Sequence, residues 1–409
     1  MKKLFLVLLS IATLFGIWGY YLRIIGGDEL SNLTSILPWG LWVASYIYFI
    51  GLSAGGFLIS SLIYVFGMKK FEAAGRIALA QAAICLVIAL LLILTDLGHP
   101  ERGLTIAYHF NYTSVMGWMF ICYNIYMIIV LWEFYLATRV DLVKIASQGT
   151  GFKHKLSGIL CAGYHDVSEE AQKKDRKLLK ILGSLGIPAA IIVHGGVGAI
   201  FATVKAHPVW NSGLFPILFL VSALASGGAL LGVLVSVFSN VKEDLKKELV
   251  KNIVVLSSTI LCFELLILFA EMSVGLYSDI PAHVASYRLM MFGPYWFVFW
   301  IVQLFVGAVL PLFIIFHPAT GNSIKRLSFA AAMIVLGTFG TRLSIVIPPL
   351  IVPDFPNLPE AYLSPRFQAQ YFPSLMEWLC LLGASALCIW AFILVNNILP
   401  LNEQKELSS

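Results

Sequence analysis

Three ionisable side chains stand inside or at the ends of long apolar runs. Asp96 and His99 belong to a polar motif, residues 96–102 (DLGHPER), that ends one run, and His194 lies inside a later run. Placing a charge in hydrocarbon costs about 2.5–3.5 kcal/mol even on lenient insertion scales. Each of these residues must therefore be paired, hydrated or functional.

The chemistry of these three residues suits a flat ligand that carries carbonyl oxygens. Histidine donates hydrogen bonds and exchanges protons near neutral pH, and a neighbouring carboxylate supports both tasks. Asp96, His99 and His194 are expected at similar depth near one membrane face, where they could bind and protonate a quinone. Alternatively, His194 only bonds to a neighbouring helix and Asp96 forms an ordinary ion pair with Arg102. The aromatic residues expected to complete a quinone site are Trp39, Tyr46 and Tyr123.

A second set of buried charges is expected from other apolar runs. Glu264 and Glu271 share one run, whereas Arg342 and Glu133 lie in two others. Glu271 and Arg342 can reach the same depth, so we expect them to pair. The set is then either a structural ion pair or a proton or ion pathway through Glu264, with Glu133 as the matching relay. Carboxylates inside helix bundles often mark such pathways.

The elements that carry these residues are predicted to be membrane-spanning helices. The chain has 409 residues, of which 59% are hydrophobic and 12% charged, and its mean hydropathy is +0.87. Apolar runs of about 20 residues are long enough to cross a bilayer as α-helices. The ~10-residue alternating segments of a β-barrel are absent, so we predict an all-α integral membrane protein. Ten spans are predicted, at 4–22, 39–66, 77–95, 115–138, 181–203, 215–238, 253–273, 294–316, 327–351 and 375–398.

Basic residues orient these spans. Of the 27 Lys and Arg, 21 fall at one set of helix ends, and by the positive-inside rule both termini are then cytoplasmic. The first run lacks a small-residue cleavage site and is expected to remain as an anchor helix. The basic segment 140–180 is expected to lie on anionic lipid headgroups, so its charge does not indicate a nucleic-acid partner.

Cysteine spacing argues against redox centres held by this chain itself. The six cysteines show no CxxC or CxxCH motif and no Cys/His pairing at metal-ligand spacing. We therefore expect no haem, no iron–sulfur cluster and no metal site in this chain.

A weak internal repeat suggests two similar halves. Residues 52–58 (LSAGGFL) match residues 224–230 (LASGGAL), although helix packing alone could favour small residues at both places. We predict two four-helix bundles, formed by spans 2–5 and 6–9, with two peripheral helices. The expected divisions are an anchor helix (1–35), a first bundle with the quinone site (36–210), a second bundle (211–352), and an outer proline-rich loop with the C-terminal helix (353–409).

Several motifs together resemble one known family. Residues 96–102 (DLGHPER) and 111–118 (NYTSVMGW) resemble the strongest signature of the polysulfide-reductase membrane subunit (NrfD-like) family. Residues 371–374 (YFPS) with Glu377 resemble its ten-helix branch, which includes membrane subunits of menaquinone reductase complexes, alternative complex III and hydrogenase-2-type enzymes. The resemblance covers about residues 35–395, but this chain has Ile347-Pro348-Pro349 where many relatives have a glycine-rich stretch. Further matches are Pro38-Trp39-Gly40, His194-Gly195, residues 222–227 and Arg342.

The resemblance implies a multi-pass subunit, without its own cofactor, in the cytoplasmic (inner) membrane of a prokaryote. Such a subunit exchanges electrons with a quinone, usually menaquinone, through a ferredoxin-like iron–sulfur subunit docked on the outer face. A further catalytic or multihaem c-type subunit is implied beyond it. The positions that match the family's quinone site are Asp96, His99 and His194, and proton translocation through Glu133, Glu264 and Glu271 is a further implication.

Two other functions fit part of the sequence. A secondary transporter would also contain repeated bundles with buried charges, but it should show Gly- or Pro-broken helices at the midplane of both halves. A b-type cytochrome membrane subunit needs two histidine ligands for one haem, and His99 and His194 are the only plausible pair. We interpret the chain as the quinone-interacting membrane subunit of a respiratory oxidoreductase complex.

Overall fold

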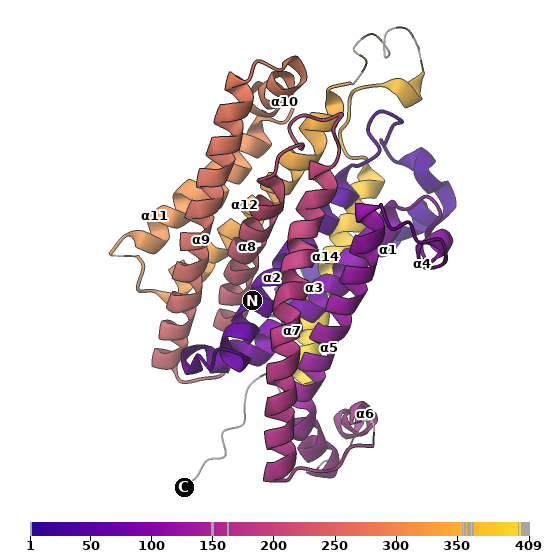
Figure 1. Cartoon of the computed structure of the whole chain (residues 1–409). Coiled ribbons are helices and arrows are strands. Elements are labelled where there is room, and N and C mark those ends of the chain that lie inside the picture. The colour runs from indigo at the N-terminus through magenta and orange to yellow at the C-terminus, as the bar shows by residue number, and fades with distance from the viewer. Residues whose placement is uncertain are drawn as a thin grey trace.

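The computed structural model describes residues 2–148, 151–161, 163–318, 320–353, 355, 357, 361, 364–399 and 401. Within these ranges the chain is helical and contains no strand, and ten segments are long and apolar enough to cross a membrane. The predicted fold class and all ten predicted spans are therefore confirmed (Figure 1). Pro356 and Pro359 of the predicted proline-rich loop lie outside the described residues. The cytoplasmic location of the termini remains a prediction.

The membrane-spanning segments form ten rods, one of which changes helix type along its length. They are α1 (Lys2–Gly26), α2 (Leu41–Tyr64), α3 (Gly75–Asp96), α5 (Val115–Gln148), α7 (Glu169–Ala202), α8 (Phe215–Phe238), α9 (Glu243–Tyr277), the π-helix η4 (Val298–Val309) continued by α11 (Leu310–Phe316), α12 (Ile324–Ile351) and α14 (Leu375–Ile398). The connecting helices are η1 (Gly27–Leu30), η2 (Lys69–Ala74), η3 (Pro100–Arg102), α4 (Thr105–Tyr108), α6 (Phe152–Leu160), α10 (Pro281–Phe292) and η5 (Pro365–Phe367).

Helices α5, α7 and α9 extend well beyond their predicted apolar spans. Helix α7 begins at Glu169, where the Ser168 hydroxyl caps the helix by accepting from the backbone N–H of Ala171 at 3.2 Å. The basic segment 140–180 therefore comprises the end of α5, the short helix α6 and the start of α7. Its predicted position on lipid headgroups remains a prediction.

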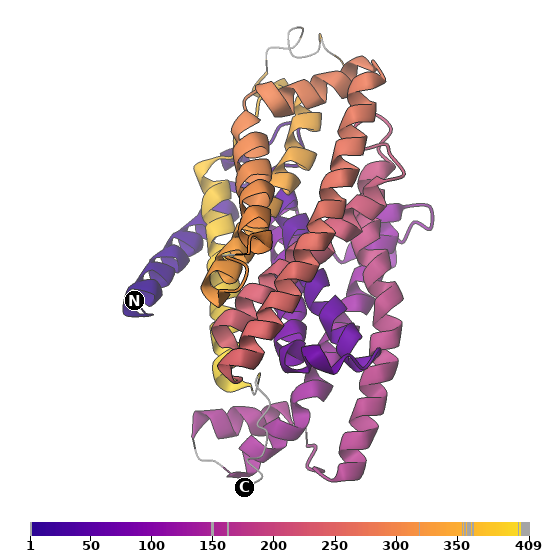
Figure 2. The ribbon, with the colours of Figure 1, turned by 90° about the vertical axis from the view of Figure 1, so that its left-hand side faces the viewer.

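The helices pack as two groups of four with a peripheral pair. Helices α2, α3, α5 and α7 form one group, because α3 and α7 each pack against both α2 and α5. Helices α8, α9 and α12 form the second group together with η4 and α11. Helix α1 packs mainly against α14, which also contacts α3, and the start of α1 projects away from the other helices (Figure 2). The division of the chain into domains at the predicted boundaries remains a prediction.

The two groups of four meet where the repeated segments cross. A Cβ atom at Gly55 of α2 would overlap the backbone of Gly227 and Gly228 of α8, and a Cβ at Gly227 would overlap Gly55. The amide nitrogen Nε2 of Gln81, from α3, donates to the carbonyl oxygens of Leu52 and Gly227, both at 2.7 Å. The repeat is therefore the contact between the bundles, where glycine is required because the backbones touch.

Helix α12 runs without a break through the segment Ile347-Pro348-Pro349. Pro348 and Pro349 lie inside the helix, which ends only at Ile351. Both prolines are buried among neighbouring helices, as is usual where a membrane helix tolerates proline. Arg342 is thus carried on an unbroken helix.

Candidate functional site

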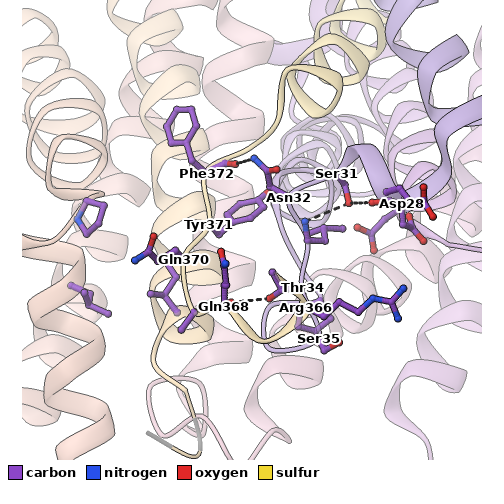
Figure 3. A pocket seen from close by; sticks show the side chains of 18 residues that line it. Asp28, Ser31, Asn32, Thr34, Ser35, Arg366, Gln368, Gln370, Tyr371 and Phe372 are labelled. Carbon is purple, nitrogen blue, oxygen red and sulfur yellow. Dashed lines mark hydrogen bonds between the residues drawn. The ribbon is translucent and has the colours of Figure 1, made fainter. Parts of the chain in front are cut away.

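A cavity of about 1320 Å³ lies at the end of the molecule where α3 ends, called the cavity end below. It is bounded by the segment that follows α1 and by the segment that precedes α14 (Figure 3). The Asn32 side chain donates to the carbonyl of Phe372 at 2.7 Å, and the Thr34 hydroxyl donates to that of Gln368 at 3.2 Å. These bonds join the two segments. The charged and amide residues that line the cavity are Asp28, Glu29, Asn32, Asp96, Arg366, Gln368 and Gln370.

Asp96 is the residue through which the first group of four helices reaches this cavity. It is the last residue of α3, and it is among the residues that line the cavity. Oxygen Oδ1 is buried and has no hydrogen-bond partner among the described residues. Arg23, Asp28 and Glu377 all lie close enough to interact with it electrostatically. A buried carboxyl oxygen without a partner is free to bond a ligand.

Arg23 of α1 holds the chain on either side of Asp96. Its Nε donates to the carbonyl oxygen of Thr95 at 2.9 Å, and its Nη2 donates to that of Leu97 at 3.1 Å. Nη2 also pairs with Asp28 Oδ1 at 2.8 Å, and the guanidinium lies 5.2 Å from the ring centroid of Trp42. Arg23 was not among the site residues predicted from the sequence. It could have been singled out, because few Lys or Arg residues lie at this set of helix ends.

Glu377 is a second buried carboxylate close to the cavity. Its side chain is fully buried, and Oε2 accepts from the backbone N–H of Ser374 at 2.8 Å and of Asn32 at 3.2 Å. Oε1 accepts from the hydroxyl of Tyr371. Ser374 in turn caps the start of α14, which completes a capping box. The spacing Ser374-x-x-Glu377 is the sequence signal that predicts this arrangement.

The Tyr371 hydroxyl joins the same network. It accepts from the backbone N–H of Leu41 at 2.8 Å and donates to Glu377. Burial, and then the negative charge of Glu377, raises the pKa of Tyr371 well above its usual value. The phenol therefore stays protonated and can donate to the carboxylate. The Tyr295 hydroxyl adds a bond to the carbonyl of Tyr371 at 2.5 Å.

His99 lies at the surface, outside the cavity lining. Its side chain is 65% exposed, and Nδ1 lies 2.9 Å from Glu101 Oε1. It follows α3 by three residues, at the start of the short helix η3, and is absent from the cavity lining. The structure therefore separates His99 from Asp96, although the two residues belong to one motif.

His194 is also separate from Asp96, because it lies in the interior of the molecule. Its helix, α7, is diagonally opposite α3 in the group of four. The imidazole is 2% exposed, and neither ring nitrogen has a hydrogen-bond partner among the described residues. The ring stands edge-on to Tyr126 at 5.6 Å between centroids, and Arg342 is within electrostatic range.

The three aromatic residues predicted for the quinone site do not form one cluster. Trp39 stacks on Trp210 at 5.8 Å between ring centroids and meets Phe201 edge-on at 5.5 Å. Tyr46 is half-buried near Tyr123, whose hydroxyl donates to the carbonyl of Leu86 on α3. None of the three predicted aromatic residues lines the cavity.

Arg342 is buried where α8 and α12 meet. It is 1% exposed, its Nη2 donates to the Ser222 hydroxyl at 2.9 Å, and its guanidinium lies 4.6 Å from the ring centroid of Phe219. Nε and Nη1 have no hydrogen-bond partner within the described part of the chain. Glu264 of α9, also 1% exposed, interacts electrostatically with Arg342 and leaves Oε2 unpartnered within the same described ranges.

The expected pair of Glu271 and Arg342 is wrong. Glu271 Oε1 instead accepts from the hydroxyl of Ser212, at 2.5 Å. Ser212 lies just before the start of α8. Arg342 turns toward Ser222, and the carboxylate that interacts with it is Glu264, about two helical turns from Glu271 on α9. The direction in which Arg342 points depends on how the helices pack. Similar depth along two helices therefore does not predict that their side chains meet.

Glu133 completes the interior set on the side of the first four helices. It is 1% exposed, and Oε2 has no partner among the described residues. It faces Gly183 of α7, where a Cβ would lie 3.2 Å from Oε1, and it is within electrostatic range of Tyr126. Tyr126 is therefore the residue that lies near both Glu133 and His194.

Comparison with known proteins places these features in a family. The family model described as polysulphide reductase, NrfD, matches residues 29–354. A selenate reductase subunit of Mesobacillus selenatarsenatis is 38% identical over 99% of this chain and 96% of its own length. The Hdr-like menaquinol oxidoreductase integral membrane subunit of Archaeoglobus fulgidus is 28% identical over 95% of this chain and 90% of its own length.

A third relative extends the comparison. The menaquinone reductase integral membrane subunit of Nitratidesulfovibrio vulgaris is 21% identical over 96% of this chain and 90% of its own length. The family match covers most of the chain, including Asp96, His194, Glu264 and Arg342. By sequence motif, ten-helix architecture and family match alike, this chain is a member of the polysulphide reductase NrfD family of membrane proteins.

Proposed function

We propose that the chain is the membrane subunit of a respiratory oxidoreductase complex and exchanges electrons between a quinone and a partner subunit. The quinone head group would occupy the cavity at Asp96, and menaquinone is the expected quinone class. Reduction adds two electrons and two protons to the ring, and quinol oxidation removes them. The electrons come from or go to clusters in the partner, and this chain supplies binding and proton exchange.

The observation that carries this proposal is that Asp96 lines the cavity and that its carboxyl oxygen Oδ1 has no hydrogen-bond partner among the described residues. A quinone carbonyl oxygen, or the hydroxyl of a quinol, is a natural partner for such a group. The cavity volume of about 1320 Å³ leaves room for a two-ring head group with part of its tail. The polar residues of the lining would hold water or the second carbonyl.

The relatives support the choice of quinone and of a multi-subunit assembly. Two are described as a menaquinol oxidoreductase subunit and a menaquinone reductase subunit, and a third as a selenate reductase subunit. We propose that a ferredoxin-like iron–sulfur subunit docks at the cavity end, taken as the outer face, with a further catalytic or c-type subunit beyond it. The complex would lie in the cytoplasmic membrane of a prokaryote.

The buried set around His194 would serve proton movement. Glu133, Tyr126 and His194 follow one another across the interface of α5 and α7, and Arg342 and Glu264 continue from His194 toward α9. Their unpartnered polar atoms would be bridged by water, since buried polar groups are costly without a partner. In this proposal His99 and Glu271 are outside the main pathway.

The test is quinone turnover by the complex purified from its native membrane. Asp96→Asn removes the exchangeable carboxyl group but keeps its shape, so menaquinone-analogue turnover should fall at least about hundredfold while the partner subunits still co-purify. The matched control is Asp279→Asn, on an exposed loop of the cavity end where φ is +55° and asparagine is well tolerated.

Two kinds of outcome would contradict the proposal. Normal turnover by Asp96→Asn would remove the proposed quinone site. A solitary chain without partners or quinone response would favour a transporter, and a haem absorption band from the purified chain alone would favour a b-type cytochrome.

A further inference from the structure

We propose that Arg23, on the peripheral helix α1, is a positioning residue for Asp96 and thereby makes α1 part of the quinone site. This inference rests on the proposed function and extends it to a helix that the family match, which begins at residue 29, does not include. Arg23 would not touch the quinone itself. It would fix the end of α3 so that the Asp96 carboxyl group faces the cavity.

The hydrogen bonds of Arg23 are the first argument. The last turn of any α-helix leaves carbonyl oxygens without a helical partner, and a cation can satisfy them. At the end of α3 the cation comes from another helix, and it bonds the carbonyls of Thr95 and Leu97, which flank Asp96 on both sides. The backbone of Asp96 is therefore held before and after the residue.

The distribution of charge is the second argument. The guanidinium makes its direct ion pair with Asp28, at 2.8 Å, and not with Asp96. Asp28 thereby restrains one amino group of Arg23, while the carboxyl oxygen Oδ1 of Asp96 has no partner among the described residues. An arginine that paired directly with Asp96 would compete with the ligand. The observed arrangement places the positive charge nearby and leaves the carboxyl group free.

The packing of Arg23 is the third argument. Its side chain is only 10% exposed, and the guanidinium lies over the buried ring of Trp42. The bidentate and stacked contacts require the planar fork of arginine, and lysine can reproduce only its charge. Helix α1 is otherwise attached mainly to α14, where Gly16 and Gly383 bring the two backbones together. Arg23 thus ties an otherwise peripheral helix to the end of α3.

The experiment is a double-mutant cycle between Arg23→Gln and Asp96→Ala in the assembled complex, with the dissociation constant of a menaquinone analogue as the measured quantity. Arg23→Gln alone should weaken binding roughly tenfold, because a displaced carboxyl group loses its ligand geometry. In the Asp96→Ala background the same change should alter binding less than about twofold, because no carboxyl group remains to be positioned.

Each alternative gives a different result. An equal loss in both backgrounds would show that Arg23 has only a structural role and would overturn this inference, even if Asp96 binds the quinone. No effect of Asp96→Ala on binding or turnover would instead overturn the proposed quinone site. Wild-type binding by Arg23→Gln would overturn the inference directly.

Two further variants keep the result interpretable. Arg23→Lys retains the charge without the fork, so it should rescue part of the loss, whereas a pure charge effect would restore binding fully. Arg288→Gln is the control, since Arg288 is an exposed arginine of α10 that does not line the cavity, and it should bind as wild type. Co-purification of partner subunits and the thermal unfolding temperature check that each variant assembles.

Discussion

The cavity end and the helix interior both contain carboxylates and an arginine, but they differ in how many of their buried polar atoms have hydrogen-bond partners. Around Asp96 and Glu377 most polar atoms are satisfied, largely by backbone groups, and the exception is Oδ1 of Asp96, a residue that lines the cavity. Around His194, Arg342 and Glu264 several polar atoms are buried without partners among the described residues. In the proposed function, the first region presents one carboxyl group to a ligand. In the same proposal, water or transferred protons satisfy the second region, because an unsatisfied buried polar group costs about 1–3 kcal/mol.

The largest effect should come from the interior cation. Arg342→Leu leaves Glu264 without its neighbouring positive charge, and removing one member of a buried pair typically costs about 3–5 kcal/mol. Thermal unfolding of the detergent-solubilised complex should show the loss. Adding Glu264→Leu to Arg342→Leu should recover much of it, because both buried charges are then gone. A double variant that is weaker still would show that the two residues do not act as a pair.

A smaller, kinetic effect should distinguish the interior from the cavity. His194→Gln removes a proton-exchanging group, so turnover should fall on the order of a hundredfold, with fewer protons moved per electron. Because His194 does not line the cavity, the dissociation constant of a menaquinone analogue should stay within about twofold of wild type. Weakened binding would place His194 in contact with the quinone. His109→Gln, at an exposed histidine, is the control.

The smallest effect should come from His99. Its side chain is 65% exposed and its partner Glu101 is 64% exposed, and exposed ion pairs contribute little. His99→Gln should therefore change quinone turnover less than about twofold, measured beside Asp96→Asn in the same preparation. A loss as large as that of Asp96→Asn would mean that partner docking brings His99 to the quinone, and the two residues would then belong to one site.

The sequence by itself determined the class of the protein, the ten spans and the residues that needed an explanation. Hydropathy decides membrane insertion, and charged residues in apolar runs are conspicuous whatever their neighbours are. The repeat around Gly55 and Gly227 was also visible, because close backbone contact restricts both positions to glycine. The half-buried Asp96 and the buried His194, Glu133, Glu264 and Arg342 were all selected from sequence.

Only the tertiary structure decided how these residues are grouped. Asp96 and His99 are three residues apart, yet the chain turns after α3 and exposes His99 while Asp96 faces the cavity. Similar depth suggested Asp96 with His194, but these residues lie on diagonally opposite helices of one group. It also suggested Glu271 with Arg342, but these side chains bond to Ser212 and Ser222 instead. Arg23 and Glu377 join Asp96 through contacts between distant parts of the chain, and sequence spacing carries no information on such contacts.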